Sequence, residues 1–135
     1  MKKLILLFSV LALTFTSCSS DDDAAASQDQ FIGNWKYYKF YEDDVEVQLG
    51  PCDYETRITI SANGTFTTKV YDGNSADACE LVETTSGTWE NLGNGMYSTT
   101  SEGDTFVQEI KFEDNRMYLD EVFDGVVYRD VFIRQ

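Results

Sequence analysis

Carboxylates are the side chains with chemical potential that this sequence offers in quantity. Aspartate and glutamate number 24, against 10 lysines and arginines, and runs such as Glu42-Asp43-Asp44 and Asp120-Glu121 recur along the chain. Hydrolysis of a glycoside needs two carboxylates at a defined separation in one cleft, and nothing in the sequence brings two of these runs together. Adjacent carboxylates are expected by chance in a chain this acidic, so we predict that the protein is not an enzyme.

Histidine is absent from the chain. This absence excludes Ser-His-Asp and Cys-His nucleophile systems as well as histidine-ligated metals. The segment from Asp72 to Asp77 faintly resembles a calcium-binding loop, but it lacks the regular spacing and the closing glutamate, so a solvated loop is the simpler interpretation. We therefore expect no catalytic residue, no metal site and no cofactor.

The charge balance also restricts the partners of the protein. The formal net charge is −14 at pH 7, and removal of a signal containing Lys2 and Lys3 would make it more negative. Nucleic acid and anionic lipid surfaces are bound by basic faces, so we expect no nucleic acid partner. The aromatic content of 14% argues against a disordered chain and for a globular domain.

The first of three cysteines, Cys18, follows a segment typical of export. Lys2 and Lys3 precede an apolar run over 4–13, which is shorter than the roughly 20 residues of a bilayer-spanning helix and is typical of a secretory signal. The stretch Thr14-Phe15-Thr16-Ser17-Cys18 resembles a lipobox, with Phe15 where that motif usually has leucine. We predict a signal peptide over 1–17 and a lipid on Cys18 that holds the protein at a membrane. An ordinary secretory signal with an incidental cysteine is the alternative.

Residues 18–30 are predicted to form a lipidated acidic tether, because they contain no large apolar side chain. Asp21-Asp22-Asp23 close behind Cys18 resembles the start of many Bacteroidetes lipoproteins, in which such residues direct export to the outer face of the outer membrane. The resemblance implies an outer membrane lipoprotein exposed at the cell surface. A plain solvated spacer, on a protein facing the periplasm, is the alternative.

The other two cysteines, Cys52 and Cys79, lie in the part of the chain that would reach an oxidising compartment. Two cysteines in that setting are predicted to form a disulfide. Its closed loop would stabilise the fold by about 3–4 kcal/mol. Free thiols or soft-metal ligands are the alternative, although two cysteines without histidine make a poor zinc site.

From Phe31 onward the sequence consists of short β-type runs separated by turn residues. In the run 54–60, for example, Tyr54, Thr56, Ile58 and Ile60 alternate with polar residues, and Asn63-Gly64 after it is a hairpin signal. Besides a short alternation at Val45–Val47, the expected strands are 35–41, 54–60, 65–71, 81–90, 96–100, 106–112, 116–123 and 126–134.

The order of these runs predicts an all-β fold. Consecutive hairpins indicate an antiparallel meander, and about eight strands suit a closed up-and-down barrel, because closure removes exposed strand edges. No segment has a convincing helical pattern. A two-sheet sandwich is the alternative architecture.

Several short motifs in this meander resemble a known family. They are Ile32-Gly33-Asn34-Trp35-Lys36, the Cys52-containing approach to Arg57–Ile60, Asn63-Gly64-Thr65-Phe66 and Gly87-Thr88-Trp89. A Gly-x-Trp at the first strand of a β-meander is similar to the lipocalin superfamily, and residues 31–135 resemble the lipocalin-like domain of Bacteroidetes lipoproteins. The resemblance implies a lipocalin-like barrel, here without the C-terminal helix of the classical lipocalins.

The resemblance also implies a plugged barrel end. Gly33 would let the chain bend tightly as it enters the barrel, and Trp35 would fill the closed end. In lipocalins a basic residue near the last strand covers this tryptophan, a role that Arg134 or Arg129 could take here as a cation–π contact of about 1 kcal/mol.

The residues expected to bind a ligand follow from the alternation of the strands. Apolar members of an inner face would line a cup, and polar residues between them would orient a bound molecule. The expected ligand-binding residues are Tyr37, Ile58, Phe66, Gln108, Ile110, Leu119 and Arg129. Glu121 lies in a similar setting, between Leu119 and Phe123. Alternatively, the polar positions lie in water near the mouth of the barrel.

Two functions remain open at this point. The first is binding of a small hydrophobic or amphipathic ligand, as the resemblance implies. The second is a filled barrel that contacts a neighbouring surface protein or a glycan. The run from Trp35 to Tyr41 has aromatic residues on both faces, so some of them must face outward, which favours a partner surface.

Overall fold

The computed structural model describes residues 28–135. The predicted signal peptide, Cys18 and the tether up to residue 27 lie outside the described residues. Within the described part, no helix has the length and apolar character needed to cross a membrane.

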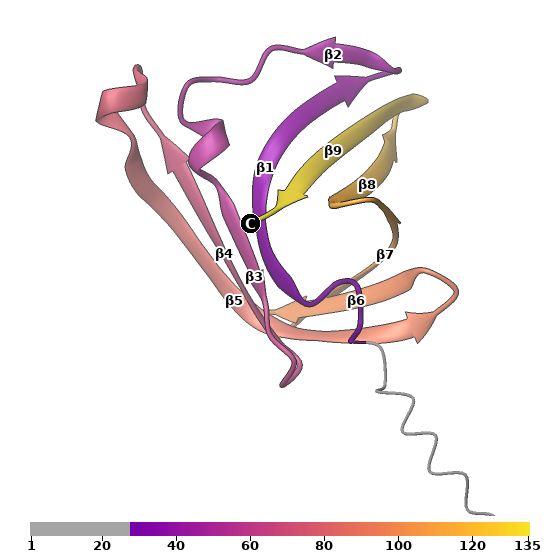
Figure 1. Ribbon diagram of the computed structural model, residues 1–135. Helices are drawn as coiled ribbons and strands as arrows, with labels where there is room; N and C mark the ends of the chain where they lie inside the picture. The colour runs from indigo at the N-terminus through magenta and orange to yellow at the C-terminus, as the bar shows by residue number, and fades with distance from the viewer. Residues whose placement is uncertain (1–27) are drawn as a thin grey trace, which may run out of the picture.

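The described chain forms nine β-strands and two short 3-10 helices (Figure 1). The strands are β1 (Gly33–Glu42), β2 (Val45–Val47), β3 (Arg57–Ile60), β4 (Thr65–Asp72), β5 (Glu80–Gly93), β6 (Met96–Ser101), β7 (Asp104–Glu113), β8 (Arg116–Phe123) and β9 (Val126–Arg134). The 3-10 helices are η1 (Asp53–Glu55) and η2 (Ala76–Ala78).

The sheet closes on itself as predicted. From β3 to β9 each strand pairs antiparallel with the next in sequence, and β1 pairs with both β3 and β9. The short β2 pairs only with the end of β1, at Phe40–Glu42. Eight strands therefore form an antiparallel up-and-down barrel, and the described residues contain no α-helix. This confirms the predicted fold class, and the sandwich alternative is excluded.

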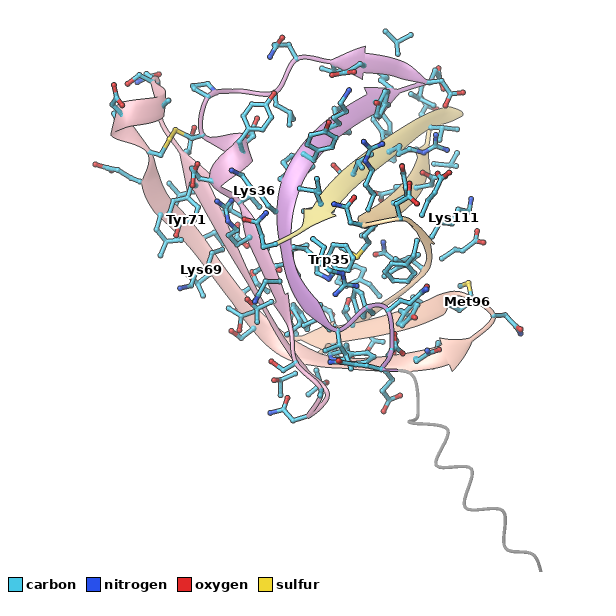
Figure 2. All side chains as sticks on the ribbon, in the orientation of Figure 1. Trp35, Lys36, Lys69, Tyr71, Met96 and Lys111 are labelled. Atoms are coloured by element: carbon cyan, nitrogen blue, oxygen red, sulfur yellow. A yellow bond between two sulfur atoms is a disulfide. The ribbon has the colours of Figure 1, made fainter. Side chains whose placement is uncertain are left out.

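Alternation along the strands separates the barrel interior from its outer surface. The buried cluster contains Phe31, Trp35, Ile60, Trp89, Tyr97, Ile110, Met117 and Phe132. Figure 2 shows Trp35 inside the barrel and Lys69 on its outer side. Each inward position of a strand is followed by an outward one, so Lys69 alternates with the partly buried Thr68 and Val70 of β4.

The strand expected at 54–60 is shorter than predicted. Residues Asp53–Glu55 form η1, and β3 begins only at Arg57. The Asp53 carboxylate accepts a hydrogen bond from the backbone of Gly50, and Thr56 donates from its backbone N–H to the carbonyl of Asp53. These local bonds, after a proline that fixes the turn, outcompete strand pairing.

The predicted disulfide is confirmed. Cys52 and Cys79 are joined with an S–S distance of 2.05 Å and a Cα–Cα distance of 5.4 Å. Cys52 is 2% exposed and directly precedes η1, while Cys79 directly precedes β5. The bond therefore links the β2–β3 connection to the start of β5, at the end of the barrel away from Trp35.

Trp35 lies at the closed end of the barrel and is 1% exposed. Its indole Nε1 donates to the carbonyl of Phe31 at 2.9 Å. The guanidinium of Arg134 lies 4.2 Å from the centre of the Trp35 ring and donates to the carbonyl of Ile32. Gly33 has φ +151°, and a Cβ at this position would collide with the Arg134 guanidinium. Of the two arginines considered, Arg134 is the one that covers the tryptophan.

The closed end also includes residues that the sequence assigned to the tether. The Asp29 carboxylate accepts hydrogen bonds from the backbone of Phe31 and from the hydroxyl of Tyr97. Arg134 donates to the carbonyl of Gln30. Asp29 and Gln30 are thus bonded to the barrel.

Candidate functional site

An apolar cavity lies inside the barrel, next to the buried cluster. Its volume is about 150 Å³. The residues that line it are Phe31, Ile58, Ile60, Phe66, Thr68, Tyr97, Thr99, Gln108, Ile110, Met117 and Leu119. Five of the seven expected ligand-binding residues are among them: Ile58, Phe66, Gln108, Ile110 and Leu119. We refer to this space as the inner cavity.

The barrel wall has a gap between β7 and β8. Only Ile110–Glu113 of β7 pair with Arg116–Leu119 of β8. The rest of β7, from Asp104 to Glu109, pairs with β6 alone, and Asp120–Phe123 pair with β9 alone. The two strands therefore separate toward the end of the barrel opposite Trp35.

A second cavity, of about 580 Å³, occupies this gap. Its lining residues are Met96, Phe106, Val107, Gln108, Glu109, Leu119, Asp120, Glu121, Val122 and Asp130. We refer to it as the lateral opening. Gln108 and Leu119 line both spaces, so the inner cavity meets the lateral opening at these two residues.

Large apolar side chains at the lateral opening are exposed to solvent. Phe106 is 63% exposed, Val107 55% and Val122 68%, and Phe123 beyond them is 70% exposed. Exposed apolar groups that gather at one place mark a binding site more often than single scattered ones do.

Tyr37 is connected to the candidate site through its hydrogen bond with Asp130. Its hydroxyl donates a hydrogen bond to the carboxylate of Asp130, and its ring lies 5.0 Å from that of Phe132. Tyr37 does not line either cavity, but Asp130 lines the lateral opening.

Burial raises the pKa of the Asp130 carboxyl above its ordinary value. The Tyr37 hydroxyl opposes this shift in the Asp130 pKa, because it stabilises the carboxylate, and the nearby charge of Glu121 adds to it. Burial, with the hydrogen bond to Asp130, also raises the pKa of the Tyr37 phenol. A half-buried carboxyl therefore lies in the wall of the candidate site, in an environment that disfavours its charge.

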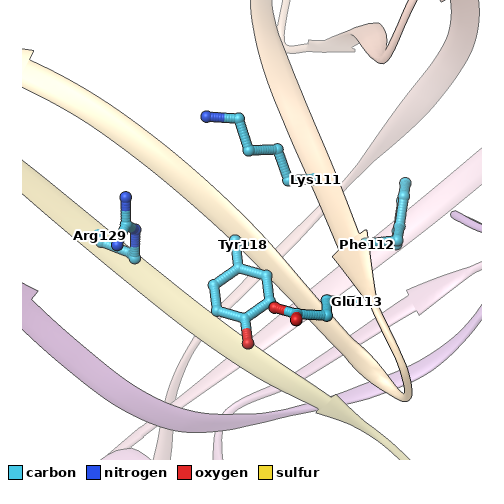
Figure 3. Close-up of a pocket in the computed structure, with 5 residues that line it drawn as sticks. All are labelled: Lys111, Phe112, Glu113, Tyr118 and Arg129. Atoms are coloured by element: carbon cyan, nitrogen blue, oxygen red, sulfur yellow. The ribbon is translucent and has the colours of Figure 1, made fainter.

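Arg129 lies on the outer surface rather than in the cup. Its Nε donates to Asp120 at 2.7 Å, and this guanidinium holds the pKa of the Asp120 carboxyl below its ordinary value. Arg129, Lys111 and Tyr118, from three neighbouring strands, line an outer groove of about 380 Å³ together with Phe112 and Glu113 (Figure 3). This groove is separate in its lining from both interior spaces.

Sequence reasoning missed Asp130 as a site residue. On β9, Val127 and Val131 flank Arg129, while Tyr128 and Phe132 flank Asp130, so both faces of the strand look apolar. The pairing of Tyr37 on β1 with Phe132 on β9 shows that Phe132, and with it Asp130, lies on the inner face of the strand. Met117 and Tyr97 are further lining residues that the sequence did not single out.

The described residues contain no group of three or more histidine, cysteine or acidic side chains arranged to hold a metal ion. The family model described as a lipocalin-like domain matches residues 31–119 of the chain. A search among curated proteins found no match.

Proposed function

The chain belongs to the family of lipocalin-like domains, and from this premise we propose that it is an envelope-anchored lipoprotein whose barrel binds a small hydrophobic or amphipathic ligand. The observation that carries the proposal is the apolar inner cavity, which shares Gln108 and Leu119 with the solvent-exposed lateral opening. A lipocalin-like barrel is compatible with ligand binding, and the identity of the ligand is the part that needs experiment.

The sizes of the two spaces support a small ligand. Binding sites for drug-sized molecules span roughly 300–1,000 Å³ and combine apolar walls with a few polar groups. The lateral opening falls in this range at about 580 Å³, and the inner cavity extends it with apolar walls. In the inner cavity, Gln108 is the one amide side chain among the lining residues.

A pair of variants on β4 tests whether the ligand enters the inner cavity. Thr68 lines that cavity, whereas Thr67 bonds to the Ser86 hydroxyl on the outer side. We expect a hydrophobic fluorescent probe to bind the full-length chain stoichiometrically, to lose binding in Thr68→Trp and to keep it in Thr67→Trp. If Thr68→Trp does not fold, Thr99→Leu narrows the same cavity from β6. Equal probe binding in the cavity variant and its control would contradict the proposal.

Native mass spectrometry of the purified protein addresses the natural ligand directly. We expect a retained small molecule, released on denaturation and absent from Thr68→Trp. The same mass found on both threonine variants would place the molecule outside the cavity.

The anchoring part of the proposal rests on Cys18 and the acidic residues behind it. We propose that the protein is an outer membrane lipoprotein of the Bacteroidetes type, exposed at the cell surface. Cys18→Ser is expected to abolish lipid labelling and membrane retention. Protease treatment of intact cells distinguishes the surface from the periplasmic face, since only a surface-exposed chain is digested without opening the cells.

A non-enzymatic role is part of the same proposal, as is the absence of a nucleic acid partner. Both rest on the lack of histidine and on the net charge of −14. A nucleic acid shift assay at low salt tests the second point, because electrostatic binding is strongest there.

A surface interaction module is the second candidate. The observation that favours it is the exposed apolar group of Phe106, Val107, Val122 and Phe123, next to the stretches of β7 and β8 that do not pair with each other. Strand edges of this kind can pair with an extended segment of another protein. Failure to take up the probe, together with recovery of one defined protein that is lost in Phe106→Ser, would favour this candidate over ligand binding.

A further inference from the structure

The acidic side chains on the outer and inner faces of β7, β8 and β9 differ in whether they have cationic partners. On the outer face, Glu109 and Asp120 have cationic partners. Lys111 lies 3.7 Å from Glu109 and 3.6 Å from Asp120, and Arg129 lies 2.7 Å from Asp120. These charges are balanced locally without any ligand.

On the inner face, Glu121 and Asp130 have no cationic partner among the described residues. They lie at neighbouring positions of β8 and β9, since Leu119 pairs with Asp130 and Glu121 with Tyr128. Asp130 receives a hydrogen bond from the Tyr37 hydroxyl, which stabilises its negative charge without neutralising it. The environment of Asp130 already raises its pKa, with Glu121 contributing to the shift.

The lining of the two spaces contains four carboxylates and no lysine or arginine. Glu109, Asp120, Glu121 and Asp130 all line the lateral opening, and the inner cavity has no charged lining residue. Arg134, which also lies on an inward position of β9, is held over Trp35 at the closed end. The lining residues therefore offer an anionic head group no opposite charge, while a cationic one would meet two carboxylates without a cationic partner.

We propose that the ligand is a cationic amphiphile, with its apolar tail in the inner cavity and an ammonium-type head group against Asp130 and Glu121 in the lateral opening. This inference rests on the proposed ligand-binding function and names the chemical class of the ligand. It depends on where the carboxylates lie, at the junction with an apolar cavity, and not on their number.

The inner cavity limits the size of the tail. A cavity of roughly 150 Å³ with walls of leucine, isoleucine and phenylalanine holds a molecule the size of benzene, and the inner cavity has about this volume. One aromatic ring or a short alkyl chain therefore fills it. Gln108, shared by both spaces, can accept a hydrogen bond from an ammonium N–H through its amide oxygen.

Three probes with the same ring and different head groups test the inference. They are 2-phenylethylamine, 2-phenylethanol and 3-phenylpropionate, titrated separately into the full-length chain and followed by NMR shifts of cavity residues. We expect the amine to bind at least about tenfold more tightly than the alcohol, the change that one favourable charge contact of about 1.4 kcal/mol produces, and the carboxylate to bind most weakly. Equal or tighter binding of the alcohol or the carboxylate would overturn the cationic class while leaving ligand binding intact. If none of the three binds, the proposed function fails as well.

Variants that remove one negative charge each complete the test. Asp130→Asn and Glu121→Gln keep the shape of the side chain, and Asp77→Asn removes a charge from an exposed position on η2. We expect the amine to lose about tenfold in affinity in Asp130→Asn, less in the solvent-exposed Glu121→Gln, and nothing in Asp77→Asn, with the alcohol unaffected by all three. An unchanged preference for the amine in the double variant Asp130→Asn, Glu121→Gln would overturn the inference.

Discussion

The closed end and the lateral opening of the barrel both contain aromatic and charged side chains, but these side chains differ in burial and in their bonding partners. At the closed end, Trp35 is 1% exposed and its indole N–H is hydrogen-bonded, and Arg134 covers its ring while bonding to backbone carbonyls. Beside the lateral opening, Phe123 is 70% exposed, β7 and β8 stop pairing with each other, and the half-buried Asp130 carboxyl has no cationic partner among the described residues. The Trp35 indole and the Arg134 guanidinium at the closed end thus have partners within the chain, whereas Asp130 at the opening has a hydrogen bond from Tyr37 and no cation among the described residues.

Under the proposed function, this difference assigns stability and ligand binding to different parts of one barrel. Buried unpaired charge and exposed apolar area both cost free energy, and such features concentrate where function needs them. The comparison predicts that substitutions at the closed end lower the free energy of unfolding strongly, and that equivalent substitutions at the opening leave it unchanged or raise it.

Truncation of the plug is expected to have the largest effect. Trp35→Ala should lower the free energy of unfolding by about 3–5 kcal/mol, because it removes a fully buried aromatic side chain and leaves a void. Phe123→Ala, at an exposed position, should change it by less than about 0.5 kcal/mol. Urea denaturation measures both, with Trp35→Phe as the milder variant if Trp35→Ala does not fold. Similar losses for Trp35→Ala and Phe123→Ala would contradict the division between the two ends.

Removal of the disulfide is expected to have the second largest effect on stability. Cys52 and Cys79 are 27 residues apart, and a loop of this length corresponds to about 3–4 kcal/mol on the chain-entropy account. The double variant Cys52→Ala, Cys79→Ala should lose this amount in urea denaturation. Because the bond lies away from Trp35, we expect NMR shifts of closed-end residues to stay as in the parent chain. Altered shifts at Trp35 would show that the two ends are structurally coupled.

Arginine-to-lysine changes compare the closed end with the outer surface of the barrel. Arg134→Lys should lower the free energy of unfolding by about 1–2 kcal/mol, since lysine keeps the charge but loses the planar contact with Trp35 and one of the carbonyl bonds. Arg129→Lys, in a partly exposed ion pair with Asp120, should lose less than about 1 kcal/mol. Thermal unfolding of both variants measures the difference, and a larger loss at Arg129 would reverse the comparison.

The smallest expected effect is an increase in stability when Asp130 is replaced by asparagine. The pKa of Asp130 is raised in the folded chain, so the folded state holds this proton more strongly than the unfolded state does. Stability therefore falls as the pH rises from the ordinary carboxyl range through the raised pKa. Asp130→Asn should melt at a higher temperature than the parent at pH 7, and the difference should vanish below about pH 4, where an ordinary aspartate is protonated in the unfolded chain. A lower melting temperature than the parent at pH 7 would contradict the assignment of Asp130 as an uncompensated group.

The sequence predicted the barrel and five of the eleven residues that line the inner cavity, because alternation in several strands is unambiguous. Ile58, Phe66 and Ile110 each have polar neighbours on both sides, so only one face of their strands can be the inner one. The pairing of Cys52 with Cys79 followed from the cysteine count after Cys18 was assigned to lipid.

The remaining parts of the site depend on tertiary structure. Arg129 and Asp130 both lie between apolar residues, and only the register of β9 against β1 assigns Asp130 to the inner face. The lateral opening results from how far β7 and β8 stay paired, and nothing in their alternation indicates where that pairing ends. The run 54–60 alternates like a strand, yet local hydrogen bonds at Asp53 make its first part a 3-10 helix.

The hydrogen bonds of Asp29 at the closed end determine where the chain leaves the barrel. This exit lies beside Tyr97, at the opposite end from the β1–β2 turn (Figure 1). A lipid on Cys18, as proposed, would therefore tether the barrel by its closed end, leaving the gap between β7 and β8, which widens toward the other end, clear of the attachment point.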